Sequence, residues 1–413
     1  MIDFARLLRP GDGVWWGQGP AEPEPLVDAL LDQMDGIGPL RAFIGLTWNP
    51  RLADPPPELT VLSYGGLGEL RRLAVAGRLE VVPCHYSALP RLFARGALPH
   101  DLGLLQVSPP DVDGTVSLGI GVEYVADAIP HTRTLVAEVN AQMPATAGTA
   151  RLPLSAFAAV VYTDRPLREA PVRAPDDVER QIAAHVAELV DDGDTLQLGV
   201  GSLPGAVFEA LAGHRDLGVH SGMITDGVLD LVERGVVTGA RKEIDPGLVV
   251  TGAALGSSSL YRGLADHPVR FRAASYTHDP AVLSRLRSLV AVNSAIEVDL
   301  LGQVGAEVRR GVHVGAVGGQ VDFSRAASLT GARSVIALRS TSGGASTIRA
   351  QLGSPVVSTG RVDVDAVVTE HGTAHLTGAT ETQRARRLVA VAAPEHRDEL
   401  TRSLVSRRRD PAG

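Results

Sequence analysis

The chain has 413 residues, 44% of them hydrophobic and only 4% aromatic, so it has room for two or three domains with aliphatic cores. Its net charge of −8 argues against nucleic-acid binding, and no apolar run is long enough to span a membrane. Because the single cysteine, Cys84, excludes an intrachain disulfide, we expect a cytoplasmic protein.

The first part of the chain alternates between helical and strand-like segments. Apolar residues recur at helical spacing in 26–34, and 88–96 predicts a short helix that ends at a glycine. The segments 42–48, 79–84 and 102–108 predict strands, and the last is apolar enough to be covered on both faces. The alternation predicts an α/β fold with a mostly parallel sheet between helices.

A segment rich in proline and charge, 163–177, has no clear periodicity and is the best candidate for a linker. After it, 178–190 predicts an amphipathic helix, and 194–201 predicts a strand that runs into a glycine-rich turn. We therefore divide the chain into a first domain of residues 1–170 and a second domain of residues 171–413.

Two pairs of matching segments indicate that these domains are duplicates. Gly17 and Gly199 each open a Gly-x-Gly turn between a strand and a helix, and they lie 199 − 17 = 182 residues apart. The segments 108–113 (SPPDVD) and 294–299 (SAIEVD) are offset by 294 − 108 = 186 residues. Chance similarity of strand–turn–helix units is the alternative. Two such domains face to face would leave a cleft at the carboxyl ends of their strands, where α/β folds bind ligands.

Two glycine-rich turns are candidates for an anion or oxyanion site. Gly199-Val200-Gly201 precedes a helix, whose free amide groups favour negative charge. Gly318 and Gly319 are consecutive and would expose amide groups suited to the oxyanion of a tetrahedral intermediate. On the motifs alone, an ordinary tight turn explains each of them equally well.

Glu297 and Asp299 lie two residues apart in a strand-like run, so they point to the same face, as a pair of acid–base carboxylates would. A structural role at the end of a sheet is the favoured alternative. His220 is followed directly by Ser221, and neighbours in sequence cannot readily form a hydrolase triad. The other histidines show no zinc-binding spacing, so we expect no metal.

Longer stretches resemble the acetyl-CoA hydrolase/CoA-transferase family, which includes 4-hydroxybutyrate CoA-transferases. The resemblance covers nearly the whole chain. The stretches that carry it are 17–23, 82–93, 104–119, 137–144, 196–207, 216–235, 292–304, 318–329 and 363–378. It implies two CoA-transferase domains with an active-site cleft between them, a homodimer, and acyl-CoA substrates.

The resemblance also implies a mechanism and a set of site residues. In the family, a glutamate carboxylate attacks the acyl-CoA carbonyl, and coenzyme A passes through a glutamyl thioester to a second small carboxylate. The two amide groups that hold the oxyanion match Val200 and Gly319. The expected contacts to coenzyme A are Gly199, Gly201, His278, Gly318 and Gln320.

The chain departs from the family pattern at the nucleophile. The family stretch His-Thr-Glu-Met, followed by Ser-Asp-Gly, reads HSGMITDG here, with Gly222 at the glutamate position. His278 stands where the family has an asparagine, and the lysine of a family loop is missing from 340–344. We expect the glycine to leave a void, open to water or to another acceptor. The candidate bases are Glu297, Asp226 and His220.

Three functions follow from this pattern. The favoured one is an enzyme that hydrolyses an acyl-CoA or transfers its small acyl group directly. The second is a CoA-transferase whose carboxylate nucleophile comes from elsewhere, for example Glu297. The third is a homologue that binds acyl-CoA without catalysis.

Overall fold

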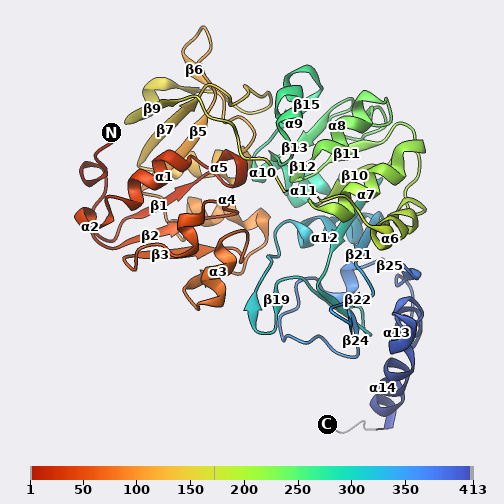
Figure 1. The fold of residues 1–413 in the computed structure, drawn as a ribbon. Helices are drawn as coiled ribbons and strands as arrows, with labels where there is room; N and C mark the ends of the chain where they lie inside the picture. The colour runs from red at the N-terminus through yellow and green to blue at the C-terminus, as the bar shows by residue number, and fades with distance from the viewer. Residues whose placement is uncertain (1, 172, 410–413) are drawn as a thin grey trace.

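The computed structural model describes residues 2–171 and 173–409, apart from the side chains of residues 405–409. Two large sheets form two adjoining lobes, the first-half lobe in red to yellow and the second-half lobe in green to blue (Figure 1). Helices lie against both sheets, and the strands within each sheet are mostly parallel. The predicted α/β class is confirmed.

The first sheet has seven strands that all run parallel to their neighbours. In spatial order they are β4 (Leu79–Val81), β3 (Leu59–Ser63), β2 (Leu40–Phe43), β1 (Gly13–Trp16), β5 (Leu102–Val107), β7 (Thr134–Asn140) and β9 (Ala159–Thr163). Every residue of β5 is buried, as its continuous apolar sequence predicts for a central strand.

The second sheet has eight strands, and only its last pair is antiparallel. In spatial order they are β15 (Val269–Phe271), β13 (Val249–Thr251), β11 (Gly218–His220), β10 (Thr195–Leu198), β16 (Leu289–Ser294), β21 (Arg333–Ala337), β25 (Ala366–Thr369) and β26 (Gly372–His375).

Short two- and three-stranded ladders extend the loops. They are formed by β6 (Thr115–Val116) with β8 (Leu152–Pro153), β12 (Met223–Ile224) with β14 (Ala253–Ala254), β17 (Glu297–Asp299) with β18 (Val304–Gly305) and β24 (Ile348–Arg349), β19 (Val308–Arg309) with β20 (Val312–His313), and β22 (Thr341–Ser342) with β23 (Ala345–Ser346).

The two sheets share one topology, which confirms the duplication. Taken in chain order, the first seven strands of each sheet are arranged 4-3-2-1-5-6-7. Strand β1 begins at Gly13 and its counterpart β10 at Thr195, and 195 − 13 = 182 is the offset between the two glycine turns. The second matched pair of segments follows β5 and β16, which also occupy equivalent places.

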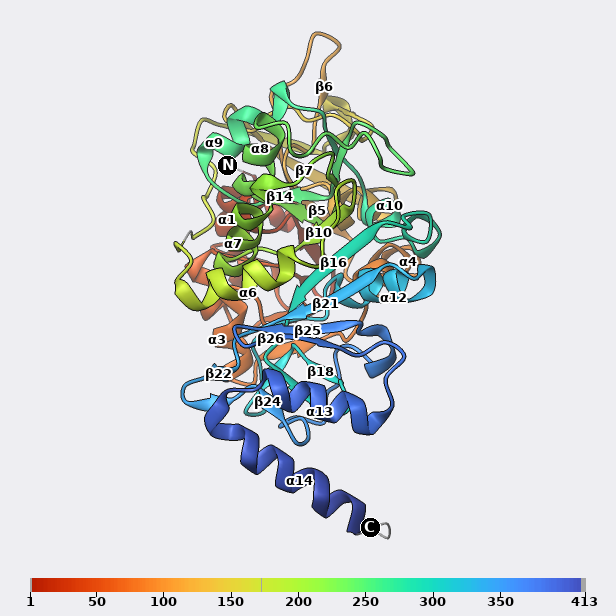
Figure 2. The same cartoon turned by 90° about the vertical axis from the view of Figure 1, so that its right-hand side faces the viewer.

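The helices are α1 (Glu24–Leu31), α2 (Met34–Ile37), α3 (Leu70–Val75), α4 (Leu89–Ala94), α5 (Glu123–Ala128), α6 (Asp177–Ala187), α7 (Ser202–Ala210), α8 (Asp226–Glu233), α9 (Ser258–Gly263), α10 (Ala274–Thr277), α11 (Pro280–Leu283), α12 (Gln320–Thr330), α13 (Glu381–Val391) and α14 (Arg397–Arg409). Helix α6 starts where a capping box forms, since Asp176 accepts from the Glu179 amide and Glu179 accepts from the Asp176 amide. Helix α14 extends away from the body of the molecule (Figure 2).

The lobes are joined by one apolar core. A single cluster of buried side chains contains Trp15 and Phe43 from the first half and Val290 and Val368 from the second. Helix α10 of the second half packs against α5 of the first. Burial of apolar surface between the halves therefore fixes how the ends of the two sheets face each other.

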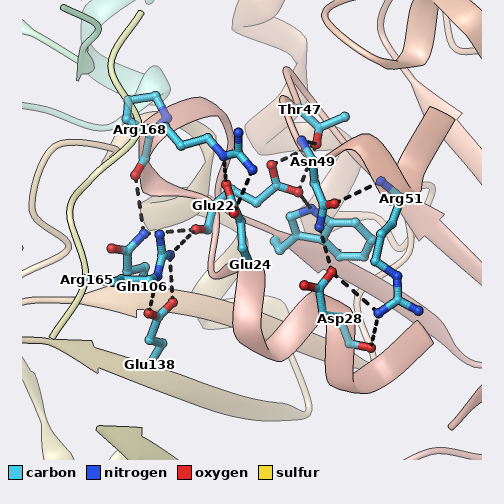
Figure 3. A network of polar contacts seen from close by, with 12 residues as sticks. Glu22, Glu24, Asp28, Thr47, Asn49, Arg51, Gln106, Glu138, Arg165 and Arg168 are labelled. Carbon is cyan, nitrogen blue, oxygen red and sulfur yellow. Dashed lines mark hydrogen bonds and ion pairs between the residues drawn. The ribbon is translucent and has the colours of Figure 1, made fainter. Parts of the chain in front are cut away.

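The proline-rich segment 163–177 is anchored to both halves. Arg165 donates to Glu138 at 2.6 Å and to the Glu22 carbonyl at 2.9 Å, while Arg168 pairs with Glu24 (Figure 3). The Ala170 amide donates to the Gly256 carbonyl of the second half at 2.9 Å. Residue 170 remains our proposed boundary between the domains 1–170 and 171–413.

Across the described residues, every helix is too short or too polar to cross a lipid bilayer. No three His, Cys, Asp or Glu side chains of that same region are grouped closely enough to hold a metal ion.

Candidate functional site

The turn after β10 opens onto a small cavity of about 110 Å³. Strand β11 lies on one side of β10 and β16 lies on the other. The chain therefore connects strands in opposite directions on the two sides of β10, and the order of the strands reverses at this point of the sheet. Gly199 and Val200 line the cavity together with Asn293 and Ser294 from the end of β16. No atom lies within 4 Å of the place where a Gly199 Cβ would stand, and Val200 is 44% exposed. Open α/β sheets bind ligands at this kind of position.

A larger cavity of about 490 Å³ adjoins the first and shares Leu203, Ser294 and Ala337 with it. The β22–β23 hairpin, which begins at Thr341, forms part of its wall. The wall also carries four arginines: Arg309, Arg310, Arg339 and Arg349. Guanidinium groups match the geometry of phosphate oxygens, so this cavity suits a ligand that carries phosphate.

The four arginines differ in how firmly they are held. Arg339 pairs with Asp176 and lies 3.4 Å from Glu179, and Arg309 donates to Ser342 Oγ at 3.0 Å. Arg310 is exposed and has no ion pair among the described residues. Arg310 is therefore the arginine of this wall with the greatest freedom to meet a ligand.

Glu297 lines the same cavity, but its carboxylate already has partners. It accepts from the Gly353 amide at 2.6 Å and lies 3.3 Å from Arg349 Nε. Asp299 accepts from the Leu301 and Gln303 amides of its own loop at 2.9 and 3.0 Å. Both carboxylates therefore hold neighbouring backbone segments in place, which is the structural role that we favoured for this pair.

The void that we expected beside Gly222 is not there. A Cβ at residue 222 would stand 2.7 Å from Cε1 and 2.8 Å from Nε2 of His278. A Cβ at Gly319 would stand 2.4 Å from the same Nε2. The imidazole of His278 is thus inserted between Gly222 and Gly319, and it fits only because both residues lack a side chain.

Both halves of the molecule hold this imidazole in place. The ring of Tyr86, from the first half, lies 4.7 Å from it, and the ring of Phe323 lies 5.1 Å away, both measured between centroids. The Tyr86 amide donates to the Gly318 carbonyl at 3.0 Å, which docks the turn before α12 onto the first half. His278 is only 4% exposed.

His220 and His278 both remain neutral at physiological pH. Burial and the nearby His220 lower the pKa of His278 to about 3. Burial and the positive charge of Lys242 lower the pKa of His220 to about 4. His220 Nε2 is 3.2 Å from the Thr277 carbonyl oxygen, and its Nδ1 has no partner among the described residues.

The remaining predicted residues separate into two groups. Ser221 Oγ donates to the Leu198 carbonyl at 3.1 Å, so the turn that contains Gly199, Val200 and Gly201 is adjacent to Gly222. Asp226 and Gln320 instead stabilise their own surroundings. Asp226 accepts from the Ser257 amide at 3.0 Å, and Gln320 donates to Thr359 Oγ1 at 3.0 Å. That the Val200 and Gly319 amides meet at one carbonyl stays a prediction.

A buried polar cluster of the first half, which the sequence did not reveal, lies next to this site. Gln18 donates to the Tyr86 hydroxyl at 3.0 Å and to Glu123, and the Tyr86 hydroxyl also donates to Glu123. Burial raises the pKa of Glu123 to about 7, and Glu123 has a φ of +28°, which is unusual for a residue with a side chain. Its amide donates to the Gly252 carbonyl, and the Gly252 amide in turn donates to the Gly222 carbonyl at 3.1 Å.

Sequence reasoning also missed the arginines of the cavity and the role of Tyr86. Arg309 and Arg310 are adjacent, and this pair was the one available signal. Arg339 directly precedes the 340–344 loop, but Arg349 lies ten positions further along the chain, and only the fold brings them to one wall. Nothing in the local sequence around Tyr86 predicts that it contacts His278.

Comparisons with known proteins match this architecture. The N-terminal domain model of the acetyl-CoA hydrolase/transferase family matches residues 3–165, and the C-terminal domain model matches residues 256–404. The chain is 36% identical to a 4-hydroxybutyrate coenzyme A transferase of Clostridium kluyveri, covering 92% of this chain and 90% of the relative.

Solved structures agree with these matches. RipA from Yersinia pestis superposes with a TM-score of 0.91 at 33% identity, covering 98% of this chain and 96% of RipA. A 4-hydroxybutyrate CoA-transferase from Porphyromonas gingivalis gives a TM-score of 0.82 at 34% identity, covering 97% and 95% of the two chains. The chain therefore belongs to the acetyl-CoA hydrolase/transferase family.

Proposed function

We propose that this protein cleaves acyl-CoA thioesters by passing a small acyl group directly to water or another acceptor, without a glutamyl intermediate. The observation that carries this proposal is the site itself. The cleft beside β10 is open, while the family's nucleophile position is Gly222 and the space of its side chain holds an imidazole. A residue without a side chain cannot form the acyl anhydride of a ping-pong transferase.

The shape and charge of the cavities support coenzyme A as the part of the substrate that is recognised. The larger cavity has the volume of an ordinary small-molecule site, and its four arginines suit the phosphates of coenzyme A. The smaller cavity continues from it to Val200 and would receive the thioester end. Gly199 lines this path. We keep Gly201 and Gly318 as proposed contacts to coenzyme A and His278 as a proposed contact at the thioester end, whereas the Gln320 amide is held by Thr359 Oγ1.

The relatives support the class of acceptor. The matched relative from Fasciola hepatica is named a succinyl-CoA:acetate/propanoyl-CoA:succinate CoA transferase, and one from Saccharomyces cerevisiae is named an acetyl-CoA hydrolase. A small carboxylate and water are therefore the acceptors to try first. We also keep a homodimer as a proposal, to be measured by analytical ultracentrifugation.

The test follows both free coenzyme A and newly formed acetyl-CoA, with acetyl-, butyryl-, 4-hydroxybutyryl- and succinyl-CoA as substrates, with and without acetate. We expect release of free coenzyme A or formation of acetyl-CoA with at least one of them. A single turnover in H₂¹⁸O then separates the two routes, because hydrolysis places the label in the released acid and direct transfer does not. The absence of both thiol release and acetyl-CoA formation with every substrate, in a protein that binds coenzyme A, would contradict the proposal.

A specific observation favours a second candidate, a homologue that binds acyl-CoA without catalysis. His278 fills the space where the family carries out its covalent step, and it is almost entirely buried. A relocated carboxylate is the weaker alternative, since Glu297 is already held by Gly353 and Arg349. Mass spectrometry under turnover addresses that alternative, because a coenzyme A adduct on Glu297 would establish it.

A further inference from the structure

We infer that His278 is the catalytic base of this protein and that its Nε2 takes over the position of the missing glutamate. The inference deepens the proposed function and rests on it. It starts from the insertion of the imidazole between Gly222 and Gly319, the two positions that the family pattern assigns to the nucleophile and the oxyanion hole.

The position of Nε2 matches the reach of the absent side chain. The carboxyl carbon of a glutamate lies about 2.5 Å from its own Cβ, because two bonds of about 1.5 Å meet at a tetrahedral angle. His278 Nε2 lies 2.8 Å from the Cβ position of residue 222. It is also 2.4 Å from the Cβ position of Gly319, so a reacting group held by the Gly319 amide would lie beside it.

Thr277 sets the tautomer that a base requires. Thr277 Oγ1 donates to the Ala273 carbonyl at 3.2 Å, so its hydroxyl proton is committed there. We assign the donor of the 2.9 Å contact between Thr277 Oγ1 and His278 Nδ1 to Nδ1–H, the direction that is compatible with this commitment. The lone pair is left on Nε2, which has no hydrogen-bond partner among the residues that the structure describes. A second group that orients the imidazole in this way is characteristic of catalytic histidines.

The surroundings keep the imidazole uncharged. The groups that face it are the rings of Tyr86 and Phe323, the two glycines and neutral His220, and none of them carries a charge. Open space lies beside Gly318, the residue that precedes Gly319. The base is therefore unprotonated before substrate arrives, and negative charge that develops on the thioester oxygen raises its proton affinity during the reaction.

The step balances without any further reactant. The oxygen of a water molecule bonds to the thioester carbonyl carbon while one of its protons moves to His278 Nε2. The carbonyl oxygen becomes an oxyanion, which the Gly319 and Val200 amides are placed to stabilise. Collapse of this intermediate breaks the C–S bond, and the leaving thiolate takes the proton back from Nε2. The products are the free acid and coenzyme A.

The test compares full-length variants for thiol release and for coenzyme A affinity. His278→Gln keeps a polar group near the Nε2 position but removes the basic nitrogen, and we expect kcat to fall about 100-fold or more. Its dissociation constant for coenzyme A should stay within about threefold, because the base does not bind the phosphates. His214→Gln is the matched control, since His214 bonds the Val190 carbonyl at 3.0 Å in a different part of the second half.

Thr277 is a positioning residue, so the test of its role needs a measurement that a purely structural role would not change. Thr277→Val should lower kcat about tenfold with KM unchanged, while Thr277→Ser restores it, because serine keeps the hydroxyl. In ¹⁵N-histidine NMR of the wild type, the signal that disappears in His278→Gln should show an unprotonated Nε2 and a protonated Nδ1. The tautomer is thereby measured without any turnover.

The outcomes separate this inference from the proposed function. If the wild type releases thiol and His278→Gln keeps kcat within threefold, the proposed function stands and His278 is only packing. A protonated Nε2 in the NMR spectrum would overturn the inference whatever the kinetic result, and His278→Asn provides the signal assignment if His278→Gln fails to fold. If the wild type neither releases thiol nor forms acetyl-CoA from acetate, the proposed function fails, and the role of His278 as a base fails with it.

Discussion

The turns after β1 and β10 begin with the same sequence pattern and occupy the same place in two sheets of the same topology, yet they have opposite environments. In the first half, Gln18 is the middle residue of the turn, is 8% exposed, and accepts from the Leu46 amide and the Tyr64 hydroxyl, both at 2.7 Å. In the second half, Val200 is the middle residue, is 44% exposed, and borders a cavity.

The difference shows that the two copies of a duplicated fold have different roles. The first half closes its turn with a polar side chain that bonds Tyr86 and Glu123, and Tyr86 then packs on His278 of the second half. The second half leaves its turn open to a ligand. One copy of the fold therefore supplies a wall and the other an open edge, and the catalytic proposal, which assigns the ligand to that edge, depends on this asymmetry.

The largest expected effect restores the family chemistry at the open edge. Gly222→Glu alone should give no transferase activity and a less stable protein, because its Cβ would meet the His278 ring at 2.7 Å. Gly222→Glu combined with His278→Asn removes this clash and should produce acetate-dependent CoA transfer through a glutamyl-CoA adduct, which the wild type cannot form. The measurements are a transfer assay and mass spectrometry of the glutamyl-CoA adduct.

Gly222→Ala combined with His278→Asn is the matched control, because it has the same space but no carboxylate. A double variant with glutamate that folds and binds coenzyme A, yet forms no adduct, would contradict the assignment of residue 222 as the nucleophile position.

The arginines that line the larger cavity provide the next test of the asymmetry between the two halves. Arg309→Ala with Arg310→Ala should weaken coenzyme A binding about tenfold to hundredfold, because each lost charged hydrogen bond to a phosphate contributes about 1.5–3 kcal/mol before screening by solvent. Isothermal titration calorimetry at two salt concentrations measures the dissociation constant of coenzyme A and its dependence on salt. Arg71→Ala with Arg72→Ala removes an exposed pair from α3 in the first half and should leave affinity unchanged. Equal losses in both pairs would mean that the second half holds no phosphate site.

Equivalent substitutions in the two turns sharpen the comparison further. Gln18→Ala should cost about 1–3 kcal/mol of unfolding free energy, because it leaves the Leu46 amide and the buried Tyr64 hydroxyl without their hydrogen-bond acceptor. Val200→Ala should change stability by less than about 0.5 kcal/mol, since the side chain is largely exposed. Urea unfolding of both variants measures the difference, and equal costs would show that the two turns are packed alike.

A pH dependence that arises in the first half alone provides a last test. Burial raises the pKa of Glu22 from 4.5 to about 8 in the folded protein, where Thr47 Oγ1 donates to it at 2.7 Å (Figure 3). Between these two values the folded protein binds more protons than the unfolded chain, so this contribution is complete below about pH 4.5 and is lost as pH rises through 8. Glu22→Gln should remove a slope of up to about 1.4 kcal/mol per pH unit from the stability profile.

The control for this profile is Glu209→Gln, which removes an exposed carboxylate from α7. Denaturation between pH 5 and 8 measures both variants. If the wild type and Glu22→Gln have the same slope, Glu22 does not titrate in this range.

Much of the fold was predictable because its signals are local. Helical spacing gave α1, α4 and α6, and a continuous apolar run gave β5. The predicted strand 42–48 shows the limit, since β2 ends at Phe43. The residues after it are equally apolar, but they turn inward to pack against Gln18, as the Leu46 amide shows by donating to that side chain. Hydrophobic periodicity alone does not predict such a contact.

The candidate site was predictable only as a set of positions. The sequence by itself determined the α/β class, the duplication, the two glycine turns and the absence of a side chain at residue 222, because each depends on short-range pattern or residue identity. Only the tertiary structure decided what fills that space. His278 lies 56 residues further along the chain (278 − 222 = 56), and the packing of α10 between the lobes brings its ring to Gly222. Packing is a property of neighbours in space, and no local pattern specifies which side chain will occupy a gap that another residue has left.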